Sequence, residues 1–334
     1  MNILVLKDDK PGHYNQTEGI LLDLKEKYSD LKIEYIEVEI KSKISRKLLR
    51  VLLNNFSIFF ERNSTKFIGY FYKNFTMPNK KPDLIISTGG NVSNINAWLS
   101  KYFKCKNILN GALRGLNENL FTYITTVIDL GYKNQIILDV APNIITKEKL
   151  TEKSEEFIHL YNLDTNQKYY TLLIGGDGAG YKYDDKFYND LIFFVKKISK
   201  KRNIKWLITT SRRTPKDVEI KLEEELKNCS SYFVSYNKKE EKILTPFLGL
   251  SKAIFVTEES SSMISEAISA KKAVFSIRPE NYKKNKKYQL LIDKFINNKT
   301  LKSISIKDYY NLDFEGFNIK ESNNIFNETD LLDG

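Results

Sequence analysis

Short continuous apolar runs that end in polar or glycine-containing turns recur along this sequence, and a helix-like stretch follows most of them. Residues 1–6, 83–87, 169–174 and 253–257 are four such runs. Apolar runs without polar alternation indicate strands that are buried on both faces, and helices between successive strands are typical of parallel sheets. The pattern therefore predicts an α/β chain of parallel sheets with helices on both faces.

The runs fall into two groups, and a length of 334 residues suits two domains. The first group has strands expected at 1–6, 33–40, 83–87, 106–109, 122–126 and 135–140, with helices at 17–28 and 92–102. The second has strands at 169–174, 205–210, 253–257 and 273–277, with helices at 184–201, 215–228 and 261–270. We predict two tandem Rossmann-like, doubly wound parallel-sheet domains at 1–145 and 167–312. A linker at 146–166 contains a helix at 147–160, and a tail spans 313–334.

Cysteine usage and hydropathy exclude several classes of protein. Cys105 and Cys229 lie far apart and have no disulfide or metal-ligand spacing. The first residues lack the basic and apolar regions of a secretion signal, and no apolar stretch reaches the roughly 18 residues that span a bilayer. We expect a cytoplasmic protein that does not cross a membrane. A peripheral position on the inner face of the membrane is compatible with this expectation.

One segment carries most of the positive charge. The chain has a net charge of +11, and residues 41–81 contain ten Lys or Arg against one acid, Glu61. Between 44 and 75, cations alternate with aromatic residues. The cations are Arg46, Lys47, Arg50, Arg62, Lys66 and Lys73, and the aromatics are Phe56, Phe59, Phe60, Phe67, Tyr70, Phe71, Tyr72 and Phe75.

Such a segment can lie in a lipid interface with its cations toward anionic headgroups. Alternatively, it forms internal helices whose aromatics are core residues and whose charges are solvated. Stacking of single-stranded nucleic acid on the aromatics is the least favoured interpretation, and we expect no nucleic-acid partner.

Two strand-to-helix turns of the first domain carry polar side chains, which in open parallel sheets is where ligands bind. The first turn holds Asp9, Gly12, His13, Asn15 and Gln16. His13 is one of only two histidines and stands at a predicted helix entrance, where an imidazole can act as a general base. The alternative is that His13 and Asn15 only cap the helix. The second turn holds Gly89, Gly90 and Asn91, whose backbone amides can bind a phosphate or a sugar hydroxyl.

Three turns of the second domain indicate an anion site. Gly175, Gly176 and Gly178 follow a strand, but their spacing fits neither a dinucleotide fingerprint nor a P-loop. Two later strands are followed by Ser211–Arg213 and Ser260–Ser262. Hydroxyls at helix N-termini together with two arginines can hold a pyrophosphate. The alternative is helix capping by the hydroxyls, with solvated arginines.

At these residues the sequence resembles the mitochondrial-fission "elongated mitochondria" family of plants and its bacterial relatives. The matching stretches are 9–16, 87–94, 209–215 and 256–267, and the likeness extends over most of the chain. That family looks similar to glycosyltransferases. The order of features also resembles the lipid-linked N-acetylglucosaminyltransferase of peptidoglycan synthesis, an enzyme of the glycosyltransferase-B architecture.

The resemblance implies the glycosyltransferase-B architecture, with His13 as the candidate base and Glu266 as the candidate ligand of the donor ribose. This chain departs from that enzyme at Lys271, where a glycine would follow the glutamate, and in the single glycine of its histidine turn. The departures leave the acceptor and the donor base open.

We therefore expect an enzyme of cell-envelope glycan synthesis that transfers a sugar from a nucleotide-sugar to a membrane-associated glycolipid or lipopolysaccharide-type acceptor. His13 or Asp9 would remove the acceptor proton. Cationic and hydroxyl groups would stabilise the leaving phosphate, so neither a metal nor a cofactor is expected. The predicted donor-side residues are Gly175, Gly176, Gly178, Ser211, Arg212, Arg213, Glu258, Ser260, Ser261, Ser262, Met263 and Glu266.

Two alternatives stand beside this expectation. A sugar-nucleotide epimerase or hydrolase can share the fold and would need an acid/base pair such as Glu258 and Glu259. A membrane-associated adaptor would keep the fold without turnover.

Overall fold

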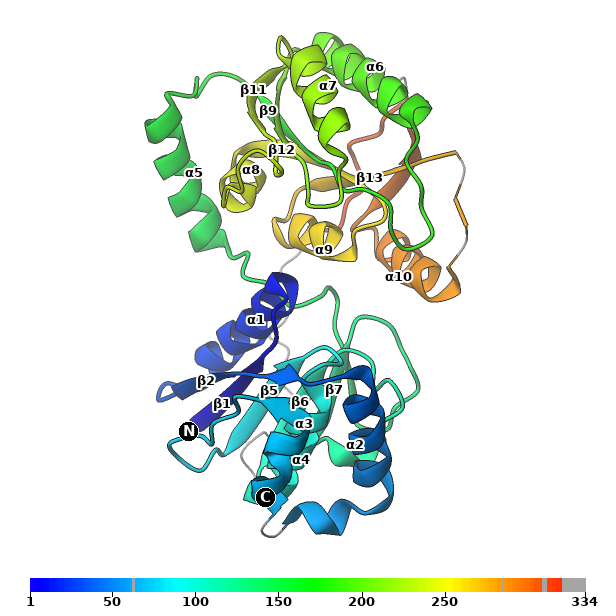
Figure 1. Ribbon diagram of the computed structural model, residues 1–334. Coiled ribbons are helices and arrows are strands. Elements are labelled where there is room, and N and C mark those ends of the chain that lie inside the picture. The colour runs from blue at the N-terminus through cyan, green and yellow to red at the C-terminus, as the bar shows by residue number, and fades with distance from the viewer. Residues whose placement is uncertain (62–63, 281, 284, 308–310, 320–334) are drawn as a thin grey trace. The chain divides into compact units, whose positions relative to one another are not determined.

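The computed structural model describes residues 1–61, 64–280, 282–283, 285–307 and 311–319. The chain divides after Ile144 into two compact units, which we call unit 1 (Met1–Ile144) and unit 2 (145–319 of the described residues). Each unit has its own six-stranded sheet (Figure 1). Among the described residues, no helix combines the length and the apolar character that a membrane crossing requires.

The sheet of unit 1 is parallel throughout, in the order β2-β1-β5-β6-β7-β8. Its strands are β1 (Asn2–Lys7), β2 (Lys32–Glu37), β5 (Leu84–Thr88), β6 (Lys106–Asn110), β7 (Tyr123–Thr126) and β8 (Gln135–Ile137). The helices are α1 (Pro11–Lys27), α2 (Lys43–Asn55), α3 (Ile68–Phe71) and α4 (Ser93–Phe103), with 3₁₀ turns η1 (Ser57–Glu61), η2 (Ser64–Phe67) and η3 (Glu118–Leu120). A separate antiparallel pair joins β3 (Glu39–Ile40) to β4 (Tyr72–Lys73).

Successive residues of the central strands of unit 1 face opposite sides of the sheet, and helices cover both sides. Ile3 and Val5 belong to the core beneath α1, whereas Leu4 and Leu6 belong to the core shared with α2 and α4. Trp98 of α4 is fully buried in that second core. Burial on both faces explains why these strands have continuous apolar runs.

Unit 2 repeats the same construction in the order β11-β10-β9-β12-β13-β14, again parallel. Its strands are β9 (Tyr169–Leu173), β10 (Lys205–Thr209), β11 (Ser230–Val234), β12 (Ser251–Thr257), β13 (Ala273–Arg278) and β14 (Lys302–Ser305). Its helices are α5 (Lys147–Tyr161), α6 (Asp185–Arg202), α7 (Lys216–Leu226), α8 (Leu244–Leu250), α9 (Ser261–Ser269) and α10 (Lys286–Asn297). One core packs α6 and α7 on the sheet, and another joins α5 and α8 to its opposite side.

The predicted pair of doubly wound parallel-sheet domains is confirmed. The interval predicted as a linker, 146–166, contains α5, and Phe157 of α5 packs against Phe247 of α8 within unit 2. Phe314 and Phe317 of the predicted tail pack against the larger core of the same unit. Residues 320–334 of that tail lie outside the described residues.

Several predicted elements were wrong or missing. The helix expected at 17–28 begins at Pro11, and the strand expected at 33–40 is two short strands that belong to different sheets. The strands β11 and β14 and the helices α8 and α10 had no counterpart in the prediction.

The basic and aromatic segment 44–75 is partly internal and partly exposed. Phe60 and Tyr72 are fully buried, and Phe67, Phe71 and Phe75 pack partly buried against the core of unit 1, as the internal interpretation expects. Phe56, Phe59 and Tyr70 are exposed. Arg62 lies outside the described residues.

Candidate functional site

The first cluster of polar side chains lies where the winding of the unit 1 sheet reverses. β1 pairs with β2 on one side and with β5 on the other, so the chain leaves these two central strands toward opposite edges. Loops at such a reversal separate from each other, and ligands of open parallel sheets bind there. Asp8 follows β1, and Gly89, Gly90 and Asn91 follow β5.

An aspartate and a histidine form a pair at this reversal. His13 Nδ1 lies 3.0 Å from both carboxylate oxygens of Asp8. The side chain of Asp8 is 2% exposed and that of His13 25% exposed. Burial acts to raise the pKa of Asp8, but its hydrogen bond and charge interaction with His13 prevail, so that the pKa is lowered. An ionised carboxylate only accepts hydrogen bonds, and Nδ1 of His13 must therefore donate.

That hydrogen bond fixes the chemistry of the other ring nitrogen. With Nδ1 protonated, the neutral imidazole presents Nε2 as an acceptor. Nε2 has no hydrogen-bond partner among the described residues. A histidine oriented in this way can take a proton from a hydroxyl group placed against Nε2.

Glycine at position 89 makes room for the imidazole. Gly89 has φ +89°, and a Cβ atom on it would overlap the ring of His13. The next residue, Gly90, lies against the side chain of Arg114 in the same close manner. Asn91 completes the turn, because its Nδ2 donates to Asp8 Oδ2 at 3.3 Å and its Oδ1 accepts from Arg46 at 2.9 Å. The predicted glycine turn and histidine turn therefore meet in one cluster.

The structure revises the predicted details of the histidine turn. Gly12, His13, Asn15 and Gln16 lie in the first turns of α1 and not in a loop. Asp9, the predicted alternative base, is exposed, and its neighbour Asp8 is the carboxylate that contacts His13. Gln16 accepts a hydrogen bond from Asn110 at 2.8 Å and so serves to position α1 on the sheet.

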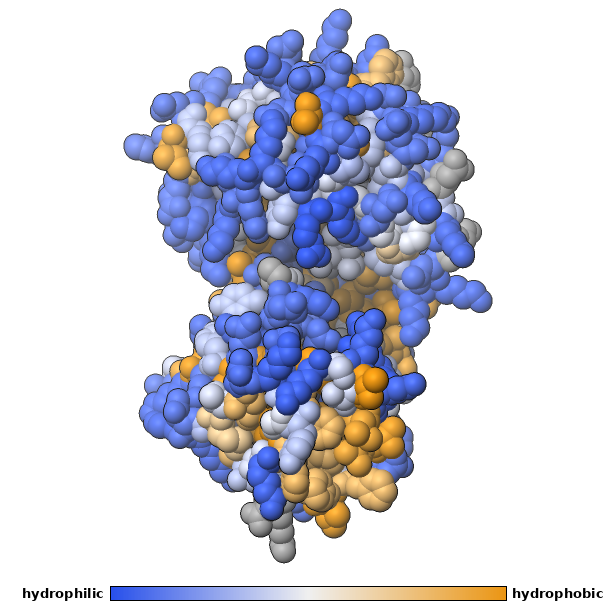
Figure 2. Space-filling model, viewed as in Figure 1, coloured by the Kyte–Doolittle hydropathy of each residue, from blue (hydrophilic) through white to orange (hydrophobic). Residues whose placement is uncertain are grey.

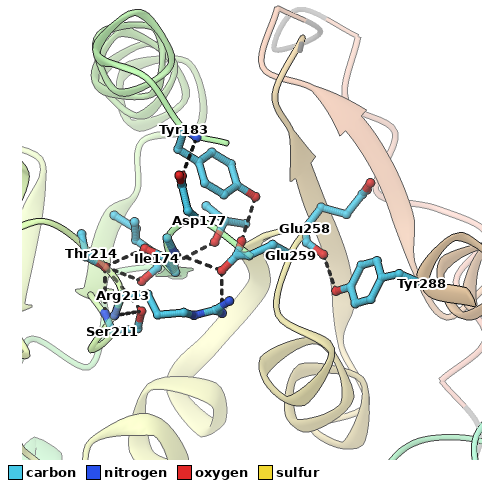
Figure 3. A network of polar contacts seen from close by, with 12 residues as sticks. Ile174, Asp177, Tyr183, Ser211, Arg213, Thr214, Glu258, Glu259 and Tyr288 are labelled. Atoms are coloured by element: carbon cyan, nitrogen blue, oxygen red, sulfur yellow. Dashed lines mark hydrogen bonds and ion pairs between the residues drawn. The ribbon is translucent and has the colours of Figure 1, made fainter. Parts of the chain in front are cut away.

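In unit 2 the winding reverses between β9 and β12, and the predicted glycine loop follows β9. A Cβ atom on Gly175 would overlap Glu259, and one on Gly176 or Gly178 would overlap Arg213. Arg213 pairs with Glu259 at 2.9 Å, and Glu259 also accepts from the Gly176 amide at 3.0 Å (Figure 3). These glycines are needed for close packing inside the unit.

Two further groups of the predicted donor site are occupied by internal bonds. The Ser211 hydroxyl accepts from the Arg213 amide at 3.2 Å within its own turn. Glu258 is completely buried and accepts hydrogen bonds from Tyr181, Ser276, Arg278 and Ser303. Burial raises the pKa of Glu259 even though Tyr183 and Arg213 oppose the shift. Glu258 and Glu259 thus hold the loops of unit 2 together.

The remaining predicted donor residues have polar groups that are available to a ligand. Arg212 is exposed and forms no ion pair with any described carboxylate. Ser260 is the N-cap of α9 without a side-chain capping bond, and Ser261, Ser262 and Met263 form the first turn of that helix. A helix N-terminus with free amides and hydroxyls suits a phosphate group.

Glu266 lies one turn further along α9 and has an unusual carboxyl group. Burial raises its pKa to about 7. No hydrogen bond or ion pair joins the carboxyl of Glu266, which is partly buried, to any described residue. Strongly perturbed carboxyls without structural partners are typical of binding sites.

The chain is similar to known proteins along most of its length. A family model described as "Mitochondrial fission ELM1" matches residues 11–329. Uncharacterized protein RP120 of Rickettsia prowazekii (strain Madrid E) is 23% identical, over 90% of this chain and 89% of the relative.

Among solved structures, the UDP-GlcNAc 2-epimerase of Methanocaldococcus jannaschii has a TM-score of 0.56 at 13% identity, over 92% of this chain and 89% of that one. The Neisseria meningitidis UDP-GlcNAc 2-epimerase, solved with bound UDP-GlcNAc, has a TM-score of 0.56 at 13% identity over 92% and 88%. These likenesses show a common fold, and the predicted glycosyltransferase-B architecture of two Rossmann-like domains is confirmed.

Proposed function

Since the chain belongs to the mitochondrial fission ELM1 family and has the glycosyltransferase-B architecture, we propose that it transfers a sugar from a nucleotide-sugar to a membrane-associated glycolipid or lipopolysaccharide-type acceptor. The observation that carries the proposal is the pair of Asp8 and His13 at the reversal of the unit 1 sheet. Asp8 holds the ring with Nε2 free to accept a proton. Sugar transfer to a hydroxyl requires such a base, because the attacking oxygen loses its proton as the new bond forms.

The donor would bind to unit 2. The amides and hydroxyls of Ser260, Ser261 and Ser262 at the start of α9 would receive the diphosphate, with the exposed Arg212 as the cation. Glu266, once ionised, would accept hydrogen bonds from the ribose hydroxyls. The fold is shared with an epimerase that binds UDP-GlcNAc, which supports a nucleotide-sugar as the ligand class.

Stabilisation of the leaving diphosphate by these groups would make transfer independent of a metal ion. Negative charge grows on the leaving phosphate in the transition state, and oriented amides, hydroxyls and a guanidinium offset it without reorganisation. We therefore expect metal chelators to leave the rate of sugar transfer unchanged.

An epimerase or hydrolase activity is less well supported. That alternative assigns acid/base roles to Glu258 and Glu259, but both carboxyls are buried and occupied by internal hydrogen bonds. Neither carboxyl is therefore free to act on a bound sugar.

The first experiment measures thermal unfolding of the protein with UDP-, GDP-, ADP-, dTDP- and CMP-linked sugars. A ligand at 100 times its dissociation constant stabilises by about 2.7 kcal/mol. We expect one nucleotide class to stabilise the wild type, His13→Gln and the control His159→Gln, since His159 is an exposed residue of α5. Glu266→Gln should lose the effect.

The second experiment follows the labelled sugar of that donor with extracted membrane lipids as acceptor. We expect label in the lipid fraction for the wild type and His159→Gln, and a loss of about 10²–10⁴-fold for His13→Gln. Transfer by His13→Gln at the wild-type rate would exclude the proposed base. Conversion of the donor sugar into its epimer in the absence of acceptor would establish the epimerase instead.

A further inference from the structure

A cavity beside the Asp8–His13 pair is lined by cations. It has a volume of about 280 Å³ and lies between α2, the turn that joins β5 to α4, and the loop around residue 114. The five cations that line it are Lys43, Arg46, Lys47, Arg50 and Arg114, and the lining contains no acidic residue. We call this space the α2 cavity.

The positive charge of the α2 cavity is not neutralised within the described part of the chain. None of the five cations forms an ion pair with a described carboxylate. Arg46 and Arg50 instead donate to neutral oxygens, those of the Asn91 side chain and the Arg114 carbonyl, each at 2.9 Å. Like charges held together around a concave space repel one another and attract an anion. Guanidinium groups suit phosphate oxygens in particular.

The same helix exposes an apolar stripe next to its cations. Leu49 and Leu53 of α2 are buried in the core of unit 1. Ile44, Leu48 and Val51 project elsewhere on the helix and are 79%, 51% and 48% exposed. Exposed Phe56, Ile58 and Phe59 continue the apolar surface into η1. Figure 2 shows apolar side chains gathered on this part of unit 1.

A helix with a buried face, a cationic face and an exposed apolar face fits a ligand that is both charged and apolar. A soluble phosphate would satisfy the cations and leave the apolar stripe in water. A phosphorylated lipid would satisfy both, because its headgroup can enter the α2 cavity while the stripe lies in the membrane interface. Charge complementarity and the neighbouring stripe therefore select the lipid.

Hydrogen bonds connect the α2 cavity to the proposed base. Arg46, which lines the cavity, donates to Asn91; Asn91 donates to Asp8; and Asp8 holds His13. Gly90, also in the lining, is the residue after the glycine that accommodates the His13 ring. A phosphate bound by Arg46 would thus lie close to the hydroxyl from which His13 removes a proton.

We propose that the α2 cavity binds the phosphate group of an anionic membrane lipid, and that the sugar acceptor is such a lipid, with its phosphate near the accepting hydroxyl. The role as acceptor rests on the proposed transferase function, whereas binding of the lipid phosphate does not.

The test measures sedimentation of the full chain with vesicles of phosphatidylcholine alone or of phosphatidylcholine with phosphatidic acid. We expect binding only to the second kind. We test two cavity variants: Arg46→Gln/Arg50→Gln and the more exposed pair Lys43→Gln/Lys47→Gln. Each should bind these vesicles at least roughly tenfold more weakly than the wild type does. Circular dichroism and the unfolding temperature establish that each variant is folded.

Two controls separate the α2 cavity from general charge and apolarity. Lys25→Gln/Lys80→Gln removes the same charge from exposed positions of unit 1 outside the cavity and should bind as the wild type does. Leu48→Ser/Val51→Ser should weaken binding, whereas Ile220→Ser/Leu290→Ser, at positions 50% and 56% exposed in unit 2, should not. Equal losses in the cavity variants and the lysine control would overturn the proposal in favour of diffuse charge.

The lipid is also tested against a soluble phosphate. If inorganic pyrophosphate stabilises the wild type but not the cavity variants, and Leu48→Ser/Val51→Ser binds vesicles normally, the ligand is a soluble phosphate and the proposal fails. Stabilisation by nucleotide-sugars is measured on the same variants without vesicles. If nucleotide-sugars stabilise none of these proteins, the wild type included, the transferase function is contradicted. The vesicle result stays valid in that case.

Discussion

At the scale of single residues, the arrangement of Asp8 and His13 predicts one tautomer. The ionised Asp8 carboxylate accepts from Nδ1, so the neutral imidazole of His13 should carry its proton on Nδ1. Nitrogen–proton correlation spectra of the imidazoles test this directly, because the chain has only two histidines. We expect Asp8→Leu to abolish the Nδ1–H preference at His13 and to leave His159 unchanged. An unaltered His13 spectrum would contradict the pairing.

Gly89 should be intolerant of any side chain. In Gly89→Ala the new Cβ would displace the His13 ring, and the left-handed backbone adds strain. We expect the His13 resonances to shift and transfer to fall as far as in His13→Gln. Gly131→Ala is the matched control, because Gly131 also has a positive φ, +75°, but open space around its Cβ position. If both variants behave alike, backbone strain alone is responsible.

Glu266 predicts a dependence of stability on pH. Burial raises its folded pKa to about 7 from the ordinary 4.5, so the folded state favours the protonated form. The wild type should therefore lose stability relative to Glu266→Gln as the pH rises from about 4.5 through about 7, by up to roughly 3 kcal/mol. Urea unfolding at pH 5 and pH 8 measures the difference. Glu155→Gln, an exposed position of α5, should show no such change.

Residue types at strand ends could be predicted from the sequence, but their individual roles could not. Asp8 and Asp9 are adjacent carboxylates, and only the fold shows that Asp8 faces the histidine. Glu258 and Glu259 were expected near a ligand, yet they stabilise the loops of unit 2. A buried carboxyl with many donors and a partly buried one with none look the same in a sequence.

At the scale of secondary structure, α2 offers a direct test of its three faces. Leu49 is fully buried and Leu48, its neighbour, is 51% exposed. Leu49→Ala should destabilise the protein by about 2–5 kcal/mol through lost burial and the cavity that remains. Leu48→Ala should leave the free energy of unfolding nearly unchanged. Urea unfolding of both variants would show equal losses if the helix were oriented differently.

Elements with a strong apolar pattern could be predicted, and weak ones could not. The buried strands β1, β5, β9, β12 and β13 follow from continuous apolar runs. Every residue of β14 is only partly buried, so its sequence lacks such a run. The first turns of α1 are mainly polar because they form the site, and their sequence therefore resembles a loop.

At the scale of the whole molecule, each unit has its own sheet and its own cores, which predicts that the units unfold separately. The chain has two tryptophans, Trp98 in unit 1 and Trp206 in unit 2, and both are fully buried. Fluorescence of Trp206→Phe thus reports unit 1, and that of Trp98→Phe reports unit 2. We expect a nucleotide-sugar to raise the denaturation midpoint of Trp98→Phe only. Equal shifts in both variants would indicate one cooperative structure.

The two-domain plan could be predicted from the sequence because the strand–helix alternation occurs twice. The sequence could not show which elements, distant along the chain, lie together in the fold. The α2 cavity is built from residues near 46, 90 and 114, which no local pattern connects. Cations that seem scattered in the sequence become one binding surface only through the fold.

If Glu266 holds the donor ribose as we propose, its raised pKa makes donor binding a proton-releasing reaction. Because the pKa is raised to about 7, the carboxyl still carries protons near neutral pH, and a ribose bound by the carboxylate would displace them. The heat of binding would then include the ionisation of the buffer, and calorimetry in Pipes and in Tris would give different enthalpies for the same affinity. In a cell, the occupancy of the donor site would follow small changes in internal acidity.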